Sequence, residues 1–348
     1  MSPPLQHIQT SPTPPACADV VVIGGGIIGV FTAYYLARRG VSVDEAEISR
    51  WASWRDFAKT AGVTTHMPEK AAPAVAAALV RLGRSVHQNC AAHGIEMEGG
   101  RVSGVITEAG VIKTKTAVLA GGAWASSFCR QPGIRFPQAS IRQSILSVSP
   151  VAHRLPDALV SANVSATRRN DGRYALAISG RARVDVTPQF MRFAPQFVPM
   201  FAKRWRNRRP GSLEGIRGGH ETLARWRLDA PTPMERVRIL DPKPDLPTIR
   251  ETHRRAVELL PQLRDAKMTH AWAGYIDSTP DGVPGIGEVP GVPGFILAAG
   301  FSGHGFGIGP GAGHLIADLA TGAEPIVDPL PYRPGRFSDS AWGKVADF

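Results

Sequence analysis

Residues Val20–Gly40 have the sequence VVVIGGGIIGVFTAYYLARRG, and this stretch decides the fold. The apolar, β-branched run at 19–23 predicts a buried strand. Apolar residues recur at helical spacing from Val30 onward, and Gly40 can end the helix that they predict. A strand, a tight glycine turn and a helix in this order are typical of a parallel α/β sheet.

The glycines of this turn, Gly24, Gly26 and Gly29, follow the pattern GxGxxG. Gly24 allows the tight turn, Gly26 lets the backbone approach a pyrophosphate, and Gly29 lets the helix pack close to the strand. The first helical residues, Ile27 and Ile28, present N–H groups and the positive end of the helix dipole to the phosphate. The motif in this context predicts a dinucleotide site. The alternative is a turn that is merely rich in glycine.

An acidic residue that binds the ribose is expected about 20 residues after the first glycine. Glu47 stands 23 residues after Gly24, so its spacing fits this role. The residues before it, Val43-Asp44-Glu45-Ala46, carry two charges, and charges do not belong inside a buried parallel strand. Glu47 is therefore either the ribose ligand or part of an acidic surface turn.

Further elements follow along the chain. The pattern predicts a weakly amphipathic helix at 51–62, an Ala-rich helix at 71–83, a hairpin turn at Gly99-Gly100 and a buried run at Ala117–Ala120. Between about 134 and 265 it predicts strands at Ile141–Val148 and Tyr174–Ile178 and an amphipathic helix near 246–260. The last part predicts a strand at Phe295–Ala298, a loop at Gly300–Gly309 and a helix from about Gly311 to Leu319. This order indicates an α/β domain into which a second domain is inserted.

Composition narrows the class of protein. The 348 residues suggest two domains, and three cysteines without a CxxC pair favour neither a disulfide framework nor a zinc site, as expected in a reducing cytoplasm. We expect no membrane-spanning segment, because no run of about 18 apolar residues occurs, and no signal peptide, because residues 1–18 lack an apolar core segment. The net charge is +11, and the densest basic stretch is Lys203–Arg209. No nucleic-acid-binding motif accompanies it, so we interpret it as a solvated face.

Three more segments complete a pattern that resembles a known family. They are Ala117–Trp124 (AVLAGGAW), Ala271–Gly282 (AWAGYIDSTPDG) and Gly300–Gly307 (GFSGHGFG). With the opening motif, their order and spacing resemble FAD-dependent oxidoreductases of the D-amino-acid oxidase type, a group that includes glycine and sarcosine oxidases and D-amino-acid dehydrogenases. The resemblance implies a Rossmann-like FAD-binding domain with an inserted α+β substrate domain built on an antiparallel sheet. It divides the chain into a loose tail at 1–18, an FAD-binding domain at 19–133 and 266–330, a substrate domain at 134–265 and a C-terminal tail at 331–348.

The resemblance also implies site residues and a noncovalent FAD. The residues expected to line FAD beyond the opening motif and Glu47 are Gly121, Gly122, Trp124, Gly303, His304, Gly305, Phe306 and Gly307. Tyr275, Asp277 and Arg142 are polar candidates on the substrate side, and Arg142 could pair with a substrate carboxylate. We therefore name His304, Tyr275 and Arg142 as catalytic candidates and expect no metal. Against these roles, His304 could be a structural loop histidine and Arg142 a surface or strand-edge arginine.

The implied activity is oxidation of the C–N bond of a D-amino acid or a related small amine, with hydride transfer to flavin. The electron acceptor stays open between oxygen, a quinone and an electron-transfer protein. We expect a cytoplasmic protein that binds no nucleic acid; a peripheral contact at the inner face of the membrane and a partner subunit stay open.

The chain departs from the family after Val43, where several dozen expected residues are missing before the Ala-rich helix. The second candidate function is therefore a truncated family member, catalytically impaired, that binds FAD weakly or not at all. An NAD-linked dehydrogenase is a third candidate, since GxGxxG serves both cofactors. A basic binding protein for nucleic acid or a membrane surface is a fourth, and it rests on the net charge alone.

Overall fold

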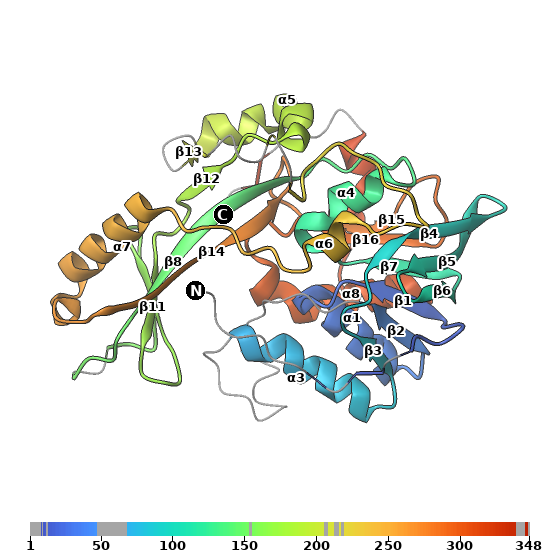
Figure 1. Cartoon of the computed structure of the whole chain (residues 1–348), viewed down its shortest axis with the longest axis horizontal. Helices are drawn as coiled ribbons and strands as arrows, with labels where there is room; N and C mark the ends of the chain where they lie inside the picture. The colour runs from blue at the N-terminus through green and yellow to red at the C-terminus, as the bar shows by residue number, and fades with distance from the viewer. Residues whose placement is uncertain are drawn as a thin grey trace.

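The computed structural model describes residues 8, 10–11, 13–46, 68–152, 155–204, 208–211, 216, 219–338 and 345–346. Figure 1 shows two main parts of the molecule. One part is a mainly parallel sheet with its helices, and the other is an antiparallel sheet with two long helices. A small three-stranded sheet covers the parallel sheet. The expected helix at 51–62 and the expected ribose ligand Glu47 lie outside the described residues.

The six-stranded sheet has the strand order β15-β16-β7-β1-β2-β3. Its strands are β1 (Val20–Ile23), β2 (Val43–Ala46), β3 (Ser85–His87), β7 (Thr116–Leu119), β15 (Gly285–Glu288) and β16 (Phe295–Ala299). All neighbours are parallel except β15, which runs antiparallel to β16. The carboxyl ends of β1, β7 and β16 therefore meet at one edge of the sheet, where ligands of such sheets bind.

Both faces of this sheet are covered. Val20 and Val22 face α1 (Ile27–Arg38), α3 (Pro68–Arg81) and α8 (Gly305–Thr321). Val21 and Ile23 face the opposite core, which holds α4 (Ala125–Arg130) and the sheet of β4 (Ala92–Glu98), β5 (Arg101–Thr107) and β6 (Gly110–Lys113). A strand buried on both faces is apolar throughout, which explains the run that predicted β1.

Helix α8 begins six residues earlier than the sequence predicts. The expected loop Gly300–Gly309 is helical from Gly305, and only five residues separate β16 from the helix. The reason is packing against α1: a Cβ on Gly309 would lie 2.9 Å from the Ile27 side chain, and one on Gly313 would lie 2.6 Å from Phe31. Close helix packing outweighs the poor helix propensity of glycine here.

The expectation that charges do not belong in the second strand was wrong. Asp44 is part of β2 and is fully buried. Its Oδ1 atom lies 2.8 Å from His87 Nε2 and accepts a 2.6 Å hydrogen bond from the Ser85 hydroxyl. Both partners stand on the neighbouring strand β3, so a local pattern around Asp44 could not reveal them. A paired buried carboxylate avoids most of the penalty that an isolated one would carry.

The second sheet is antiparallel and has seven strands. They are β8 (Ala139–Val148), β9 (Ala158–Val160), β10 (Ser165–Arg168), β11 (Tyr174–Ala177), β12 (Ala182–Val184), β13 (Arg208–Pro210) and β14 (Met268–Ser278), of which β13 alone runs parallel to its neighbour. Strand β14, which the sequence division placed in the FAD-binding part, pairs with β8 along its whole length.

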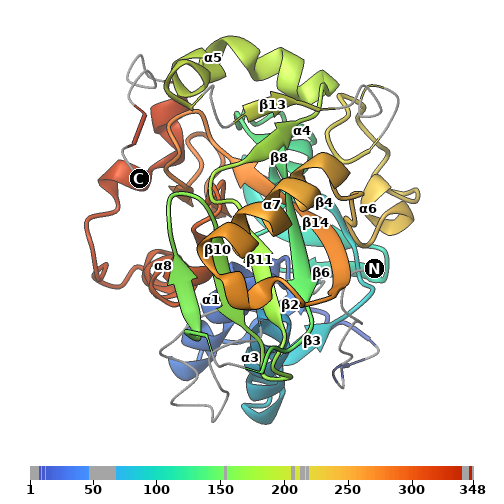
Figure 2. The ribbon, with the colours of Figure 1, turned by 90° about the vertical axis from the view of Figure 1, so that its left-hand side faces the viewer.

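Two helices cover opposite faces of this sheet. Leu146 and Val148 pack under α7 (Leu246–Leu259), whereas Ile141, on the other face, packs with the aromatic residues of α5 (Pro188–Arg204). Figure 2 shows α7 in front of the strands and α5 across the top of the molecule. Within the described ranges, no helix has both the length and the apolar content needed to cross a bilayer.

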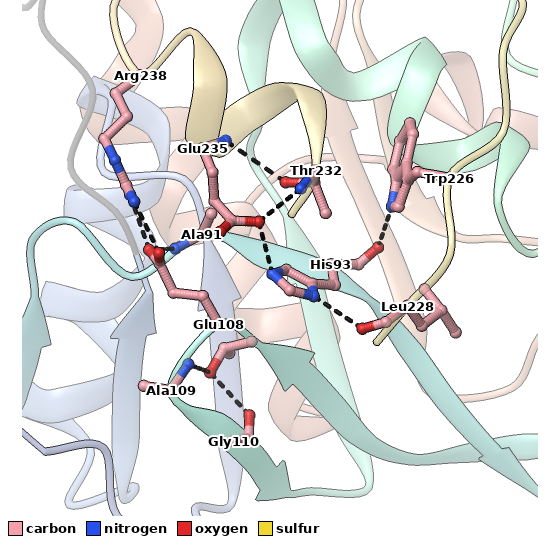
Figure 3. Close-up of polar contacts among 11 residues, drawn as sticks. Ala91, His93, Glu108, Ala109, Gly110, Trp226, Leu228, Thr232, Glu235 and Arg238 are labelled. Carbon is pink, nitrogen blue, oxygen red and sulfur yellow. Dashed lines mark hydrogen bonds and ion pairs between the residues drawn. The ribbon is translucent and has the colours of Figure 1, made fainter. Parts of the chain in front are cut away.

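A strap at 226–238, which includes α6 (Pro233–Arg236), fastens the second part of the chain to the three-stranded sheet (Figure 3). Glu108 accepts hydrogen bonds from both terminal nitrogens of Arg238 at 2.7 Å, and it also accepts one from the Ala91 N–H at 2.6 Å. His93 lies with one ring nitrogen 2.8 Å from the Leu228 carbonyl and the other 2.9 Å from Glu235. Two side-chain contacts, Arg238 with Glu108 and Glu235 with His93, therefore fasten the strap to the three-stranded sheet.

The two terminal segments also contact the fold. The Ser11 carbonyl lies 2.8 Å from His87 Nδ1, and Cys17 pairs with Lys113 as an isolated bridge. Near the other end, the chain forms 3₁₀ helices at Leu330–Tyr332 and Pro334–Phe337, in addition to those at Gly122–Trp124 and Pro261–Leu263. Arg336 is buried and forms an ion pair with Asp281 at 2.8 Å, so the segment from 331, expected to be a tail, is packed at least to Phe337.

Candidate functional site

The turn after β1 requires glycine at two positions for steric reasons. Gly24 has φ +109°, and a Cβ there would lie 2.5 Å from the Ala120 carbonyl oxygen. A Cβ on Gly29 would lie 1.8 Å from the Gly24 carbonyl oxygen. Gly26 differs, because a Cβ there would meet no described atom within 4 Å beyond its chain neighbours. The bare backbone at Gly26 thus borders open space.

Helix α1 starts at this open space. Its N-cap is Gly26, no described side chain caps it, and its first turn holds no acidic residue. The first N–H groups of a helix have no partner within the helix, so those of Ile27 and Ile28 remain available as donors. Together with the helix dipole they form an anion site of the kind that holds a pyrophosphate.

The glycines of α8 fall into two classes. Gly309 and Gly313 face α1 and permit the close packing described above. A Cβ on Gly307 or Gly311 would meet no described atom within 4 Å, and both residues are exposed. Gly307 and Gly311, four residues apart, therefore leave bare backbone on the exposed side of α8.

The loop before α8 places its residues at the same edge of the parallel sheet. Gly303 has φ +93° and is exposed, and a Cβ there would lie 3.6 Å from the Ile276 side chain. His304 is the N-cap of α8, is exposed and makes no side-chain cap to the described helix. Gly305 packs on Phe301, and Phe306 is half-buried against the core between the helices and the sheet.

At the end of β7, one of the expected cofactor residues borders open space and the others pack against the protein. Gly122 has φ +51°, and a Cβ on it would meet no described atom within 4 Å, whereas one on Gly121 would lie 3.3 Å from the Leu119 side chain. The indole of Trp124 packs on the core below and lies 5.7 Å from the His220 ring. Gly122 therefore borders open space, whereas Trp124 packs against the core that holds α4 and the three-stranded sheet.

These observations show that the chain can accommodate a dinucleotide. Glycines at which a Cβ would meet no described atom occur at the ends of β1 and β7 and on α8. The first turn of α1 presents backbone N–H groups that no described side chain caps. A flat, phosphate-bearing cofactor needs this combination of bare backbone and anion site. The described residues at this edge fit FAD.

Two of the catalytic candidates lie together, apart from the third. Arg142 on β8 and Tyr275 on β14 stand directly opposite one another in the antiparallel pair. Side chains alternate along a strand, and Ile276 faces Gly303. Tyr275 and Arg142 therefore point to the other face of the sheet, whereas His304 stands on the Gly303 loop.

Arg142 already has partners on that face. Its terminal nitrogens donate to Asp185 Oδ1 at 3.0 Å and to the Lys243 carbonyl at 2.7 Å. Its Nε is buried and has no hydrogen-bond partner among the residues that the structure describes. The Nε–H is thus a buried donor that can serve another acceptor.

A buried polar cluster next to Tyr275 was missed in the sequence. The His220 ring lies 4.5 Å from the Tyr275 ring, and its Nε2 lies 2.8 Å from the Ser140 hydroxyl. Glu221 accepts hydrogen bonds from the Ser140 N–H at 2.6 Å and the Thr187 hydroxyl at 2.7 Å. Burial lowers the pKa of His220 to about 4 and raises the pKa of Glu221. No motif marks these residues, because their partners come from β8 and the segment before α5.

Asp277 links the two sheets. Its Oδ2 accepts a 2.8 Å hydrogen bond from the Gly300 N–H, and its carbonyl accepts one of 2.9 Å from the Ser302 N–H. The surrounding protein excludes water and raises the pKa of Asp277 to about 6, although hydrogen bonds from backbone N–H groups oppose this shift. Asp277 therefore lies beside the glycine loop, and its carboxyl group holds that loop. Its expected place on the substrate side stays a prediction.

Comparison with known proteins gives one family. The family model described as "DAO: FAD dependent oxidoreductase" matches residues 19–66 and 57–319. Glycine oxidase from Pseudomonas putida is 28% identical over 276 residues, which cover 79% of this chain and 60% of that protein. Glycine oxidase from Pseudomonas aeruginosa is 26% identical over 250 residues, covering 72% and 53%. The chain thus spans little more than half the length of these relatives.

Solved structures show the same fold. L-amino acid deaminase from Proteus vulgaris superposes with a TM-score of 0.86 at 22% identity, covering 95% of this chain and 100% of that chain. The combination of a parallel sheet and an antiparallel sheet is therefore shared with that protein.

Proposed function

Because the chain belongs to the DAO family of FAD-dependent oxidoreductases, we propose that it binds FAD and oxidises the C–N bond of an amino acid or a related small amine. The observation that carries the proposal is the set of open glycines, Gly26, Gly122 and Gly307, beside the uncapped start of α1. The names of the relatives, glycine oxidase and L-amino acid deaminase, support an amino acid as substrate.

The proposed cofactor contacts are those that the sequence predicts, and Glu47, which lies outside the described residues, is included on its spacing alone. Gly24, Gly26 and Gly29 with the N–H groups of Ile27 and Ile28 hold the pyrophosphate, and Glu47 holds the ribose. Gly121 and Gly122 lie along the cofactor, and Trp124 supports them from below. Gly303, His304, Gly305, Phe306 and Gly307 border the flavin end, where the start of α8 favours negative charge. When bound, FAD supplies the oxidising power by accepting a hydride from the carbon next to the amine nitrogen.

On the substrate side, the chain needs to orient the amine and hold any carboxylate. Arg142 is the proposed carboxylate partner through its Nε–H, and Tyr275 is proposed to position the substrate beside it, on the face of β8 and β14 opposite to Ile276. His304 is the proposed positioning group on the Gly303 loop. A D-amino acid is the proposed substrate. The electron acceptor is proposed to be oxygen, a quinone or an electron-transfer protein.

The visible spectrum of the purified full chain tests the proposal. We expect flavin absorption bands, present at once or after FAD is added, that bleach under anaerobic conditions with a D-amino acid, glycine or sarcosine. A colourless protein that takes up no FAD would favour the second candidate function, a truncated family member without the cofactor. The sequence feature that favours that candidate is the stretch of expected residues missing after Val43.

Replacing Arg142 tests its role separately. For Arg142→Ala we expect the KM for sarcosine to rise by about 10- to 100-fold, because the charge-assisted contact of the Nε–H with the carboxylate is lost. Turnover of methylamine, which has no carboxylate, should change little. An equal loss with both amines would mean that Arg142 acts only through its ion pair with Asp185.

A further inference from the structure

Helix α5 is apolar on its inner face. Phe193, Phe197 and Met200 are buried there, and Phe190 and Phe201 pack beside them against the antiparallel sheet. Gln189 adds polar contacts to this face: it accepts a 3.0 Å hydrogen bond from Arg130 and donates one of 3.1 Å to the Gln138 carbonyl. In Figures 1 and 2 the helix lies at the outer end of the molecule, across the top of both views.

The outer face of α5 is apolar as well. Met191 and Val198 are 59% and 60% exposed, and Pro195 and Ala202 are exposed between and beyond them. Their spacing of four, three and four residues places them in one stripe along the helix. A surface helix normally carries polar residues on the side that faces water, so packing within the chain does not explain this stripe.

The charges of α5 have one sign. Its only ionisable residues are Arg192, Lys203 and Arg204, and it contains no Asp or Glu. Arg135 adds a fourth cation beside the helix, with its guanidinium 5.5 Å from the centre of the Phe193 ring. An acidic residue in the first turn would stabilise the helix, so the absence of one is not explained by helix stability. The surface that complements this face is therefore anionic.

We propose that the outer face of α5 docks on a membrane surface rich in anionic phospholipids. An apolar stripe flanked only by cations is the pattern of a helix that lies in the plane of a bilayer interface. Met191 and Val198 enter the boundary between headgroups and acyl chains, and Arg192 contacts lipid phosphates. The proposal does not depend on the proposed enzymatic function.

Flotation of the full chain with lipid vesicles tests the proposal. We expect the protein to float with vesicles of phosphatidylcholine mixed with phosphatidylglycerol, to float much less with phosphatidylcholine alone, and to be released by salt. Equal binding to both vesicle types, or no binding to the anionic ones, would overturn it. The second result would leave an acidic protein surface as the occupant of the stripe.

Surface variants locate the contact. The double substitution M191S/V198S should lower the partition coefficient on anionic vesicles by about tenfold, and Arg192→Gln by about fivefold. Val160→Ser is the matched control, because Val160 is 80% exposed on β9, at the edge of the sheet opposite β13. Binding of M191S/V198S equal to that of the unsubstituted protein would overturn the proposal. The wild-type comparison of the two vesicle types decides the question even if a variant fails to fold.

Discussion

Gly26 and Gly29 stand three residues apart in one turn, and we predict opposite consequences for substitutions at the two positions. Gly26 has φ −69° and ψ 178°, which any residue adopts, and space for a Cβ. Gly26→Ala should therefore leave the unfolding midpoint nearly unchanged and weaken FAD binding by about tenfold, because a methyl group blocks the approach of the pyrophosphate.

Gly29→Ala places its methyl group 1.8 Å from the Gly24 carbonyl oxygen. Its free energy of unfolding should fall by about 1–3 kcal/mol or more, because the turn must open. Thermal unfolding and FAD titration of both variants check this pair. Unchanged FAD affinity in a stably folded Gly26→Ala would contradict the assignment of the pyrophosphate site.

His220 makes stability depend on pH. Burial keeps its native pKa at about 4, below the ordinary value of 6.5, so the unfolded chain takes up a proton between these pH values and the native state does not. The free energy of unfolding should therefore fall as the pH drops from 6.5 toward 4, by up to about 3 kcal/mol from this group alone. Urea unfolding of wild type and His220→Gln checks the sign: the variant should lose less stability than wild type on going from pH 7 to about pH 5. Parallel curves would show that His220 does not titrate in this way.

The sequence reveals the role of a residue when its partners are close in the chain, and it does not when they are distant. The GxGxxG stretch was interpretable because strand, turn and helix are adjacent in sequence. Asp44 was not, because His87 stands 43 residues later. His220 and Glu221 were missed for the same reason, since Ser140 lies 80 residues before His220.

Among the elements, the strap at 226–238 offers the clearest test. Burial alone would raise the pKa of Glu108, but the hydrogen bonds from Arg238 and the Ala91 N–H and the charge of Arg238 outweigh it and lower that pKa. A lowered carboxyl pKa stabilises the fold above the unfolded value near 4.5, and this contribution is lost as the pH falls through the native pKa. Glu108→Gln should thus cost about 1 kcal/mol at neutral pH and progressively less in acid.

The matched control lies in the same strap. Arg227 and Asp229 form an exposed ion pair at 2.6 Å, and Arg227→Gln should cause no measurable change. Chemical unfolding of the two variants at neutral and acid pH separates them. A loss that persists unchanged in acid would mean that Glu108 acts through packing and not through its charge.

The start of helix α8 could not be predicted from the sequence pattern alone. Its glycines predicted a loop because glycine is a poor helix former in isolation. The structure uses some of them to approach α1 and leaves others bare on the outer side, and only the neighbouring helix distinguishes the two groups. In contrast, the Ala-rich α3 and the amphipathic α7 were correctly predicted, since their patterns are complete within the helix itself.

For the whole molecule, the resemblance predicted the two kinds of sheet correctly, and the family match confirms it. The sequence could not show that the strand carrying Tyr275 belongs to the antiparallel sheet, because pairing with β8 joins residues at least 120 positions apart. The proposed docking of α5 on a membrane also depends on the structure, because the sequence does not show which side chains of this helix are exposed. The sequence shows a basic stretch near the end of this helix, and the structure adds the apolar stripe beside it.

Strand β14 carries a consequence for how the molecule comes apart. It begins in one sheet, and its last residue, Ser278, bridges Phe301 of the other part, where Asp277 also holds the Gly300 N–H. The end of β14 is therefore held by both parts of the molecule, so we expect the two parts to melt as a single cooperative unit. Calorimetry should show one transition with equal calorimetric and van't Hoff enthalpies, and the slowest amide protons of β8 and β16 should exchange at the same rate. Two separate transitions would mean that the strand works as a hinge between bodies that fold independently.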